Sequence, residues 1–130
     1  MIHTINVRTP QKEVLLEITG EIRKIVQESG VKDGFCCIYT PHTTAAITIN
    51  ENADFSVSRD IIKGLASLGL ERISFAHGEG NSPAHIKSSL VGCSETVFIE
   101  AGKLMLGTWQ GIFLCEFDGP RNRTVLVKIM

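Results

Sequence analysis

Three histidines in the sequence have the residue type and the setting that metal chemistry requires. His42 lies between a proline and two threonines, and His77 and His85 flank a glycine-rich segment. A site of three histidines with an open fourth position is typical of catalytic zinc. We therefore expect the three side chains to converge on a divalent metal, with zinc favoured by imidazole nitrogens and magnesium by carboxylate oxygens. A surface turn at His42 and a flexible loop at His77 are the alternatives.

The same segments offer groups that would bind an anionic substrate. Gly78 and Gly80 let the backbone approach a ligand closely, and free amides at the start of a helix favour phosphate or carboxylate. Lys87 would add positive charge to a phosphorylated ligand. The residues that we expect to contact the substrate are Thr43, Thr44, Asn52, Gly78, Gly80, Asn81 and Lys87.

Charged side chains at two further places could act in catalysis. Glu51 and Asp54 follow a probable strand, and Glu116 precedes the turn that contains Arg121. Carboxylates could serve as general bases or bind a hard metal, and an arginine could stabilise a departing pyrophosphate. These four residues are our catalytic candidates. Ordinary helix capping by Asn52 or Asp54 and a solvated strand face at Glu116 are the alternative explanations.

Short strands and three helices must position these residues. Apolar residues at helical spacing predict helices after Thr19, stopping at Gly30, and after Asn52 or Asp54. Ser82 as N-cap and Pro83 as the first helical residue predict a third helix that runs to about Val91. β-rich runs predict strands at 2–9, 12–18, 35–39, 45–50, 95–100, 103–106, 109–117 and 124–129. Strands in hairpin-like succession favour an α+β fold, with antiparallel sheets and about three helices packed on one side. We expect residues 1–130 to form one domain.

Composition and charge exclude several classes of protein. The 13 lysines and arginines nearly balance the 14 acidic residues, so a nucleic-acid-binding surface is not expected. The chain has neither a signal-peptide pattern nor an apolar run of membrane-spanning length, and we expect a cytoplasmic protein without a membrane partner. The four cysteines form no Cys-x-x-Cys motif, and we expect Cys93 and Cys115 to be structural.

Three long blocks of sequence resemble the signature of the YjbQ family. They run from His42 to Asn52, from His77 to Leu90 and from Gly107 to Arg121. The resemblance implies an antiparallel α+β fold, a homotrimer, and a histidine-lined cleft that can take a metal. It also implies a secondary thiamine-phosphate synthase activity, in which a pyrimidine pyrophosphate is joined to a thiazole phosphate and pyrophosphate is released.

The leading hypothesis is therefore an enzyme that acts on a small phosphorylated molecule. One alternative is a metal-dependent hydrolase with Glu51 or Glu116 as general base. Another is a non-catalytic protein that holds an anion or a metal. A homotrimer with clefts near the subunit boundaries would also cover open sheet edges, which are otherwise an aggregation liability.

Overall fold

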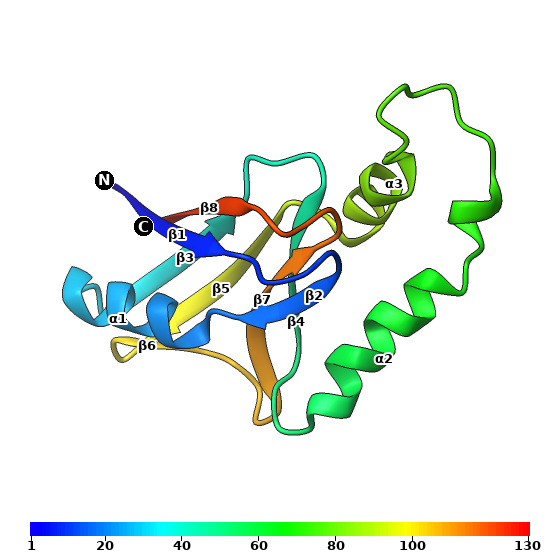
Figure 1. The fold of residues 1–130 in the computed structure, drawn as a ribbon. Coiled ribbons are helices and arrows are strands. Elements are labelled where there is room, and N and C mark those ends of the chain that lie inside the picture. Colours follow the sequence, from blue (N-terminus) through cyan, green and yellow to red (C-terminus); the bar gives the residue numbers. More distant parts are fainter.

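Two antiparallel sheets form a sandwich in the computed structural model, which describes residues 1–130 (Figure 1). One sheet has the strand order β1-β8-β3-β5-β6 and the other the order β2-β7-β4. The strands are β1 (Ile2–Arg8), β2 (Val14–Glu17), β3 (Asp33–Tyr39), β4 (Ala45–Glu51), β5 (Ser94–Glu100), β6 (Lys103–Leu104), β7 (Gln110–Glu116) and β8 (Asn122–Ile129). The helices are α1 (Thr19–Ser29), α2 (Phe55–Ala66) and α3 (Ser82–Val91), with a short 3-10 turn, η1 (Leu70–Arg72).

Strand β7 is buried on both faces and joins the two parts of the core. Ile112 and Leu114 point into the core between the sheets, whereas Phe113 and Cys115 point toward α2 and α3. Alternate residues of a strand face opposite sides of its sheet, so a strand with apolar residues on both faces needs cover on both. The larger sheet supplies one cover and the two helices the other.

The helices occupy two positions around the sandwich. Helices α2 and α3 lie along the outer face of the three-stranded sheet, and α1 lies toward the other end of the molecule (Figure 1). Helix α1 buries Ile22 and Val26 in the core between the sheets. The expected α+β class, with three helices and antiparallel sheets, is confirmed. No helix is both long enough and apolar enough to span a membrane.

Two helix starts differ in their chemistry. Asp54 caps α2 as one of the expected alternatives, because its side chain accepts a hydrogen bond from the amide of Ser56 at 2.9 Å. Thr19 does not stand before its helix but begins α1. Its buried hydroxyl instead accepts from the amide of Ile112 at 2.8 Å and donates to Glu17 at 2.8 Å. Thr19 therefore connects the helix to β7, a tertiary role that local sequence does not reveal.

The cysteines differ in burial. Burial raises the pKa of the Cys115 thiol to about 12, which keeps it protonated and unreactive. Cys93 is exposed, so our expectation of a packed, structural Cys93 is wrong.

Truncation of Cys115 should affect stability only. We expect Cys115→Ala to lower the free energy of unfolding by about 1–2 kcal/mol, because a packed side chain is lost from the core under α2 and α3. Cys93→Ala should change it by less than about 0.5 kcal/mol. Urea unfolding measures both values. Loss of ligand binding or turnover in a folded Cys115→Ala protein would contradict the assignment.

Candidate functional site

A polar cavity of about 300 Å³ lies where the β3–β4 loop, the start of α3 and the β7–β8 turn meet. No hydrophobic side chain lines it. Its lining residues are Pro41, His42, Thr43, Thr44, Glu79, Asn81, His85, Asp118, Arg121 and Arg123. The polar cavity thus brings together six residues that the sequence predicts for the site, although they come from three separate segments.

His42 is held as a neutral hydrogen-bonding group in the wall of the polar cavity. The amide of Thr124 donates to its Nε2 at 2.9 Å. Because Nε2 accepts this bond it carries no proton, so the neutral ring is protonated on Nδ1. Burial in the first place, and the charge of Arg123 in the second, lower the pKa of His42 below its ordinary value. His42 therefore has one N–H to offer a ligand.

His77 and His85 lie side by side, with ring centroids 5.4 Å apart and nearly perpendicular planes. Two imidazoles on one tetrahedral zinc ion would have centroids roughly 5 Å apart, given the Zn–N bond length. This pair therefore has the spacing to share an ion. His42 does not complete the set, since the Thr124 amide occupies its Nε2 lone pair. No group of three or more His, Cys, Asp or Glu side chains in the chain has an arrangement that could hold a metal, so the expected three-histidine centre is not formed within one chain.

Arg123 is the buried cation of the site. Its side chain is 4% exposed, and it forms an ion pair with Glu116, which is fully buried. The Arg123 Nε donates to Glu116 Oε1 at 2.8 Å, and Nη2 donates to Glu116 Oε2 and to Thr44 Oγ1 at 2.9 Å. Nη1 takes part in none of these bonds. A guanidinium fixed on two nitrogens is preorganised, and Nη1 makes no hydrogen bond within the chain, so it is free to donate to a ligand.

Glu116 positions Arg123 and has no free lone pair for base catalysis. Besides the arginine, it accepts from Thr9 Oγ1 at 2.7 Å and from the amide of Asp118 at 3.0 Å. Burial alone would raise the pKa of Glu116, but these hydrogen bonds and the charge of Arg123 outweigh it and lower the pKa. The general-base role that we considered for Glu116 does not fit these contacts.

Arg121 is the second cation of the polar cavity and is held less firmly. Its Nε donates to the backbone carbonyl of Asp118 at 2.7 Å, and its Nη2 donates to the Asp118 carboxylate at 2.9 Å. Half of its side-chain surface remains exposed. An exposed arginine held at one edge can close over a bound anion without disturbing the core.

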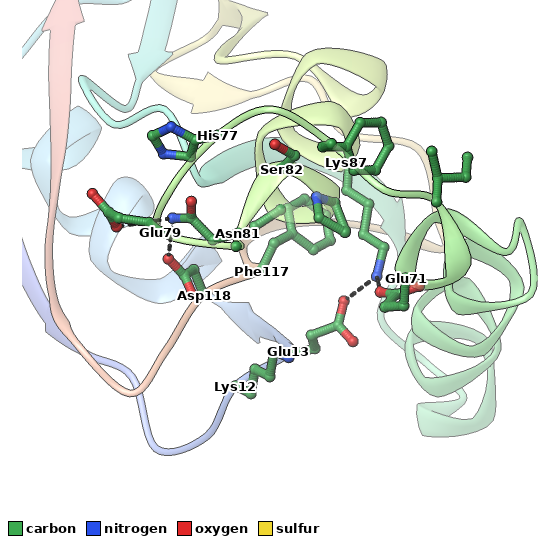
Figure 2. Close-up of a pocket in the computed structure, with 15 residues that line it drawn as sticks. Lys12, Glu13, Glu71, His77, Glu79, Asn81, Ser82, Lys87, Phe117 and Asp118 are labelled. Atoms are coloured by element: carbon green, nitrogen blue, oxygen red, sulfur yellow. Dashed lines mark hydrogen bonds and ion pairs between the residues drawn. The ribbon is translucent and has the colours of Figure 1, made fainter.

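A second cavity of about 340 Å³, the Lys87 cavity, lies against the first. Lys87 is almost fully buried, and its Nζ donates to Glu13 at 2.7 Å and to Glu71 at 2.8 Å (Figure 2). Burial opposes the charge, but the two carboxylates outweigh it and raise the pKa of Lys87. The ammonium is thus charged and already paired. It links α3 to the β1–β2 loop and to η1, so it is not free to bind the phosphate that we expected.

Several predicted residues lie outside the polar cavity of the same chain. Glu51 pairs with Gln110 at the far end of β4, a strand whose length is roughly 20 Å at 3.3 Å per residue. Asn52 donates to Glu17 at 2.9 Å, and Asp54 caps α2. Glu51, Asn52 and Asp54 therefore do not line the polar cavity of their own chain, where we expected them to act.

Of the two loop glycines, Gly80 lines a cavity and Gly78 does not line either of the two cavities. Gly80 lines the Lys87 cavity with a φ of +74°, a value that favours glycine. Gly78 lines neither of the two cavities. In contrast, Glu79, Asp118 and Arg123 line the polar cavity although we did not select them from the sequence.

The class of protein follows first from the architecture, a sandwich of two antiparallel sheets with a polar cavity where three loops meet. A crystal structure from Clostridium acetobutylicum, an uncharacterized conserved protein of the YjbQ/UPF0047 family, matches with a TM-score of 0.96 and 51% identity, over 98% of this chain and 99% of that chain. A conserved hypothetical protein from Thermus thermophilus matches with a TM-score of 0.89 and 39% identity, over 98% and 99% of the two chains.

Sequence comparison then identifies the family. Residues 3–130 match the family model described as UPF0047 protein YjbQ-like. UPF0047 protein MJ1081 of Methanocaldococcus jannaschii is 57% identical over 130 residues, which is 100% of this chain and 94% of the relative. UPF0047 protein YugU of Bacillus subtilis is 47% identical over 131 residues, with 100% and 99% covered. The chain belongs to the YjbQ-like UPF0047 family, which confirms the resemblance seen in the sequence.

Proposed function

We propose that this protein is an enzyme that acts on a small phosphorylated substrate bound in the polar cavity. The observation that carries the proposal is Arg123, a buried guanidinium fixed by Glu116 and Thr44 with Nη1 left over. Arg121 and the neutral ring of His42 line the same space. Donors of this kind form charge-assisted hydrogen bonds to phosphate oxygens, which are stronger than neutral ones.

The reaction that we propose is the one implied by the family resemblance, thiamine-phosphate synthesis. The thiazole nitrogen would form a bond to the methylene carbon of the pyrimidine, and the bond from that carbon to the pyrophosphate oxygen would break. Negative charge then develops on the departing pyrophosphate. Arg123 and Arg121 would stabilise that charge, and His42 would donate a hydrogen bond from Nδ1.

We also propose a bound divalent metal, with zinc favoured. The ring centroids of His77 and His85 lie 5.4 Å apart, which supports this proposal. A third protein ligand would have to come from another chain, because no group of three possible ligands forms within one chain. No chemical step is assigned to the metal. Metal analysis of the purified protein, compared with His85→Ala, tests this part of the proposal.

A homotrimer is the assembly that we propose. The outer face of the five-stranded sheet exposes Phe98, which is 69% exposed, together with Phe35 and Tyr39. Phe35 and Phe98 are register partners on β3 and β5, so they form a continuous apolar surface that another copy would cover. Light scattering measures the mass of the assembly.

We place the protein in the cytoplasm, since its four cysteines are free thiols and such thiols persist in reducing compartments.

The test of function is turnover with both heterocyclic substrates. Purified protein should form thiamine phosphate and pyrophosphate in equal amounts. Arg121→Gln should lower kcat/KM by about tenfold, the effect of one charged hydrogen bond, whereas Arg8→Gln, an exposed arginine on β1, should leave it unchanged.

The rival functions predict other outcomes in the same assay. Release of inorganic phosphate from one substrate alone would indicate a hydrolase. Binding of phosphate without turnover of any phosphorylated substrate would indicate a binding protein, and either result would overturn the proposed transferase reaction.

A further inference from the structure

Thr9 lies directly after β1 and is buried behind the polar cavity without lining it. Its exposed fraction is 0%, and it is not among the residues that line the cavity. The segment that follows β1 runs beside the β7–β8 turn (Figure 1). The Thr9 amide donates to the Arg121 carbonyl at 2.8 Å, and the Gly119 amide donates to the Lys12 carbonyl at 3.0 Å. Any effect of Thr9 on a ligand in the cavity must therefore pass through other residues.

The hydroxyl of Thr9 joins two groups that hold the cations of the polar cavity. Oγ1 donates to Glu116 Oε1 at 2.7 Å and accepts from the Arg121 amide at 2.8 Å. The Arg121 carbonyl also lies 3.0 Å from Oγ1, but it already accepts from the Thr9 amide. A hydroxyl has one proton to donate, and a short bond to a charged acceptor is the stronger one. The proton therefore goes to Glu116.

On one side, Thr9 fixes the carboxylate that orients Arg123. Glu116 Oε1 accepts from Thr9 and from Arg123 Nε, whereas Oε2 accepts from Arg123 Nη2 and from the Asp118 amide. Without the Thr9 hydroxyl, Oε1 would have the arginine as its one donor. The arginine would then be paired with an oxygen that nothing else holds in place.

On the other side, Thr9 fixes the main chain of Arg121. Both backbone polar groups of Arg121 bond to Thr9, the amide through Oγ1 and the carbonyl through the Thr9 amide. The turn has little room to shift, because a Cβ on Gly119 would collide with the carbonyl oxygen of Gln11 and would lie 2.9 Å from Thr9 Oγ1. The Arg121 side chain is held by Asp118 of the same turn, so its direction follows that of the turn.

We infer that Thr9 is a positioning residue that sets Arg121 and Arg123 relative to each other, so that both can donate to one bound phosphate group. This inference rests on the proposed function, since the phosphate must occupy the polar cavity. Thr9 touches neither the ligand nor the two guanidinium groups. It acts through the Glu116 carboxylate and the main chain of Arg121, and donors that are already oriented need no ordering when the anion binds.

Calorimetry with inorganic phosphate on Thr9→Val tests the inference, because valine keeps the branched shape of threonine and lacks the hydroxyl. The Kd should rise about tenfold, the effect of one hydrogen bond to a charged group. Thr19→Val is the matched control. The buried Thr19 hydroxyl also accepts from an amide at 2.8 Å and donates to a carboxylate at 2.8 Å, but it lies between α1 and β7. Its loss should leave the Kd for phosphate unchanged.

Two further replacements separate hydrogen bonding from packing. Thr9→Ser keeps the hydroxyl and should bind phosphate within about twofold of the wild-type protein. Thr9→Cys offers a weak S–H donor and a weak sulfur acceptor, so it should bind about tenfold more weakly. The two variants differ in one atom, and they decide the question even if Thr9→Val does not fold. Equal phosphate affinity in both would show that the hydroxyl has no positioning role.

A double-mutant cycle tests whether Thr9 acts on both cations. In the background of Arg121→Gln, Thr9→Val should raise the Kd by about threefold rather than tenfold, because Arg123 is then the one guanidinium left to be displaced. A full tenfold effect in that background would mean that Thr9 acts through Arg123 alone, and the inference that it sets both cations would be wrong.

The wild-type protein separates this inference from the proposed function. If the wild-type protein binds phosphate and Thr9→Val binds it equally well, the positioning role is overturned and the anion site stands. If the wild-type protein does not bind phosphate, the proposed function fails and the positioning role fails with it.

Discussion

Arg123→Met should abolish phosphate binding and lower the free energy of unfolding by about 3–5 kcal/mol, the usual effect of removing one member of a buried ion pair. The variant leaves Glu116, which is 0% exposed, without its counter-charge. Thr9 and the Asp118 amide would still donate to that carboxylate but cannot neutralise it. Urea unfolding and phosphate calorimetry measure the two effects.

The double variant Arg123→Met/Glu116→Gln separates stability from binding. Removing both charges should restore much of the lost stability, because no buried charge is left unpaired, while phosphate binding stays absent. The exposed control Arg8→Met should resemble the wild-type protein in both measurements. A double variant as unstable as Arg123→Met would show that the ion pair is not the source of the effect.

Lys87→Met should loosen the segment that carries His77. Its Nζ binds Glu13 and Glu71, whose side chains are 20% and 47% exposed. Because these carboxylates can regain water, we expect a smaller loss of about 1–3 kcal/mol. Amide hydrogen exchange should rise in the segment 70–80, where the link from η1 to α3 is lost.

Lys12→Met is the matched control, since Lys12 lines the same cavity but is exposed. It should leave both stability and exchange unchanged. If Lys87→Met instead abolished phosphate binding and left exchange in 70–80 unaltered, Lys87 would contact the substrate, as its sequence position first suggested.

The sequence predicts those parts of the fold that rest on local signals. Gly30 was expected to stop the first helix, and it adopts a φ of 72° directly after Ser29. The helix from Ser82 to Val91 was predicted from serine and proline at its start, although the residue before the helix is Asn81 and Ser82 is already helical. Each of these features depends on a few adjacent residues, so no knowledge of the tertiary contacts is needed.

The site depends on distant contacts and was only partly predicted. Glu51 follows His42 closely in the sequence, but the extended strand between them carries it to the other end of the sheet. Arg123 was considered together with Glu116 and Arg121 but was not selected, because a solvated strand face was the favoured explanation. Its spacing by two from Val125 and Val127, which are both buried, was the signal that its side chain points inward.

The contacts that fix the polar cavity have a consequence for how the protein folds. Thr9 and Glu116 are 107 residues apart in the sequence, and Arg123 and Thr44 are 79 apart. Such pairs form only after large loops have closed, which costs chain entropy and slows folding. Competence to bind an anion will therefore arise late in folding. During synthesis on the ribosome, the chain acquires its binding site only once β8 has emerged and paired with β1.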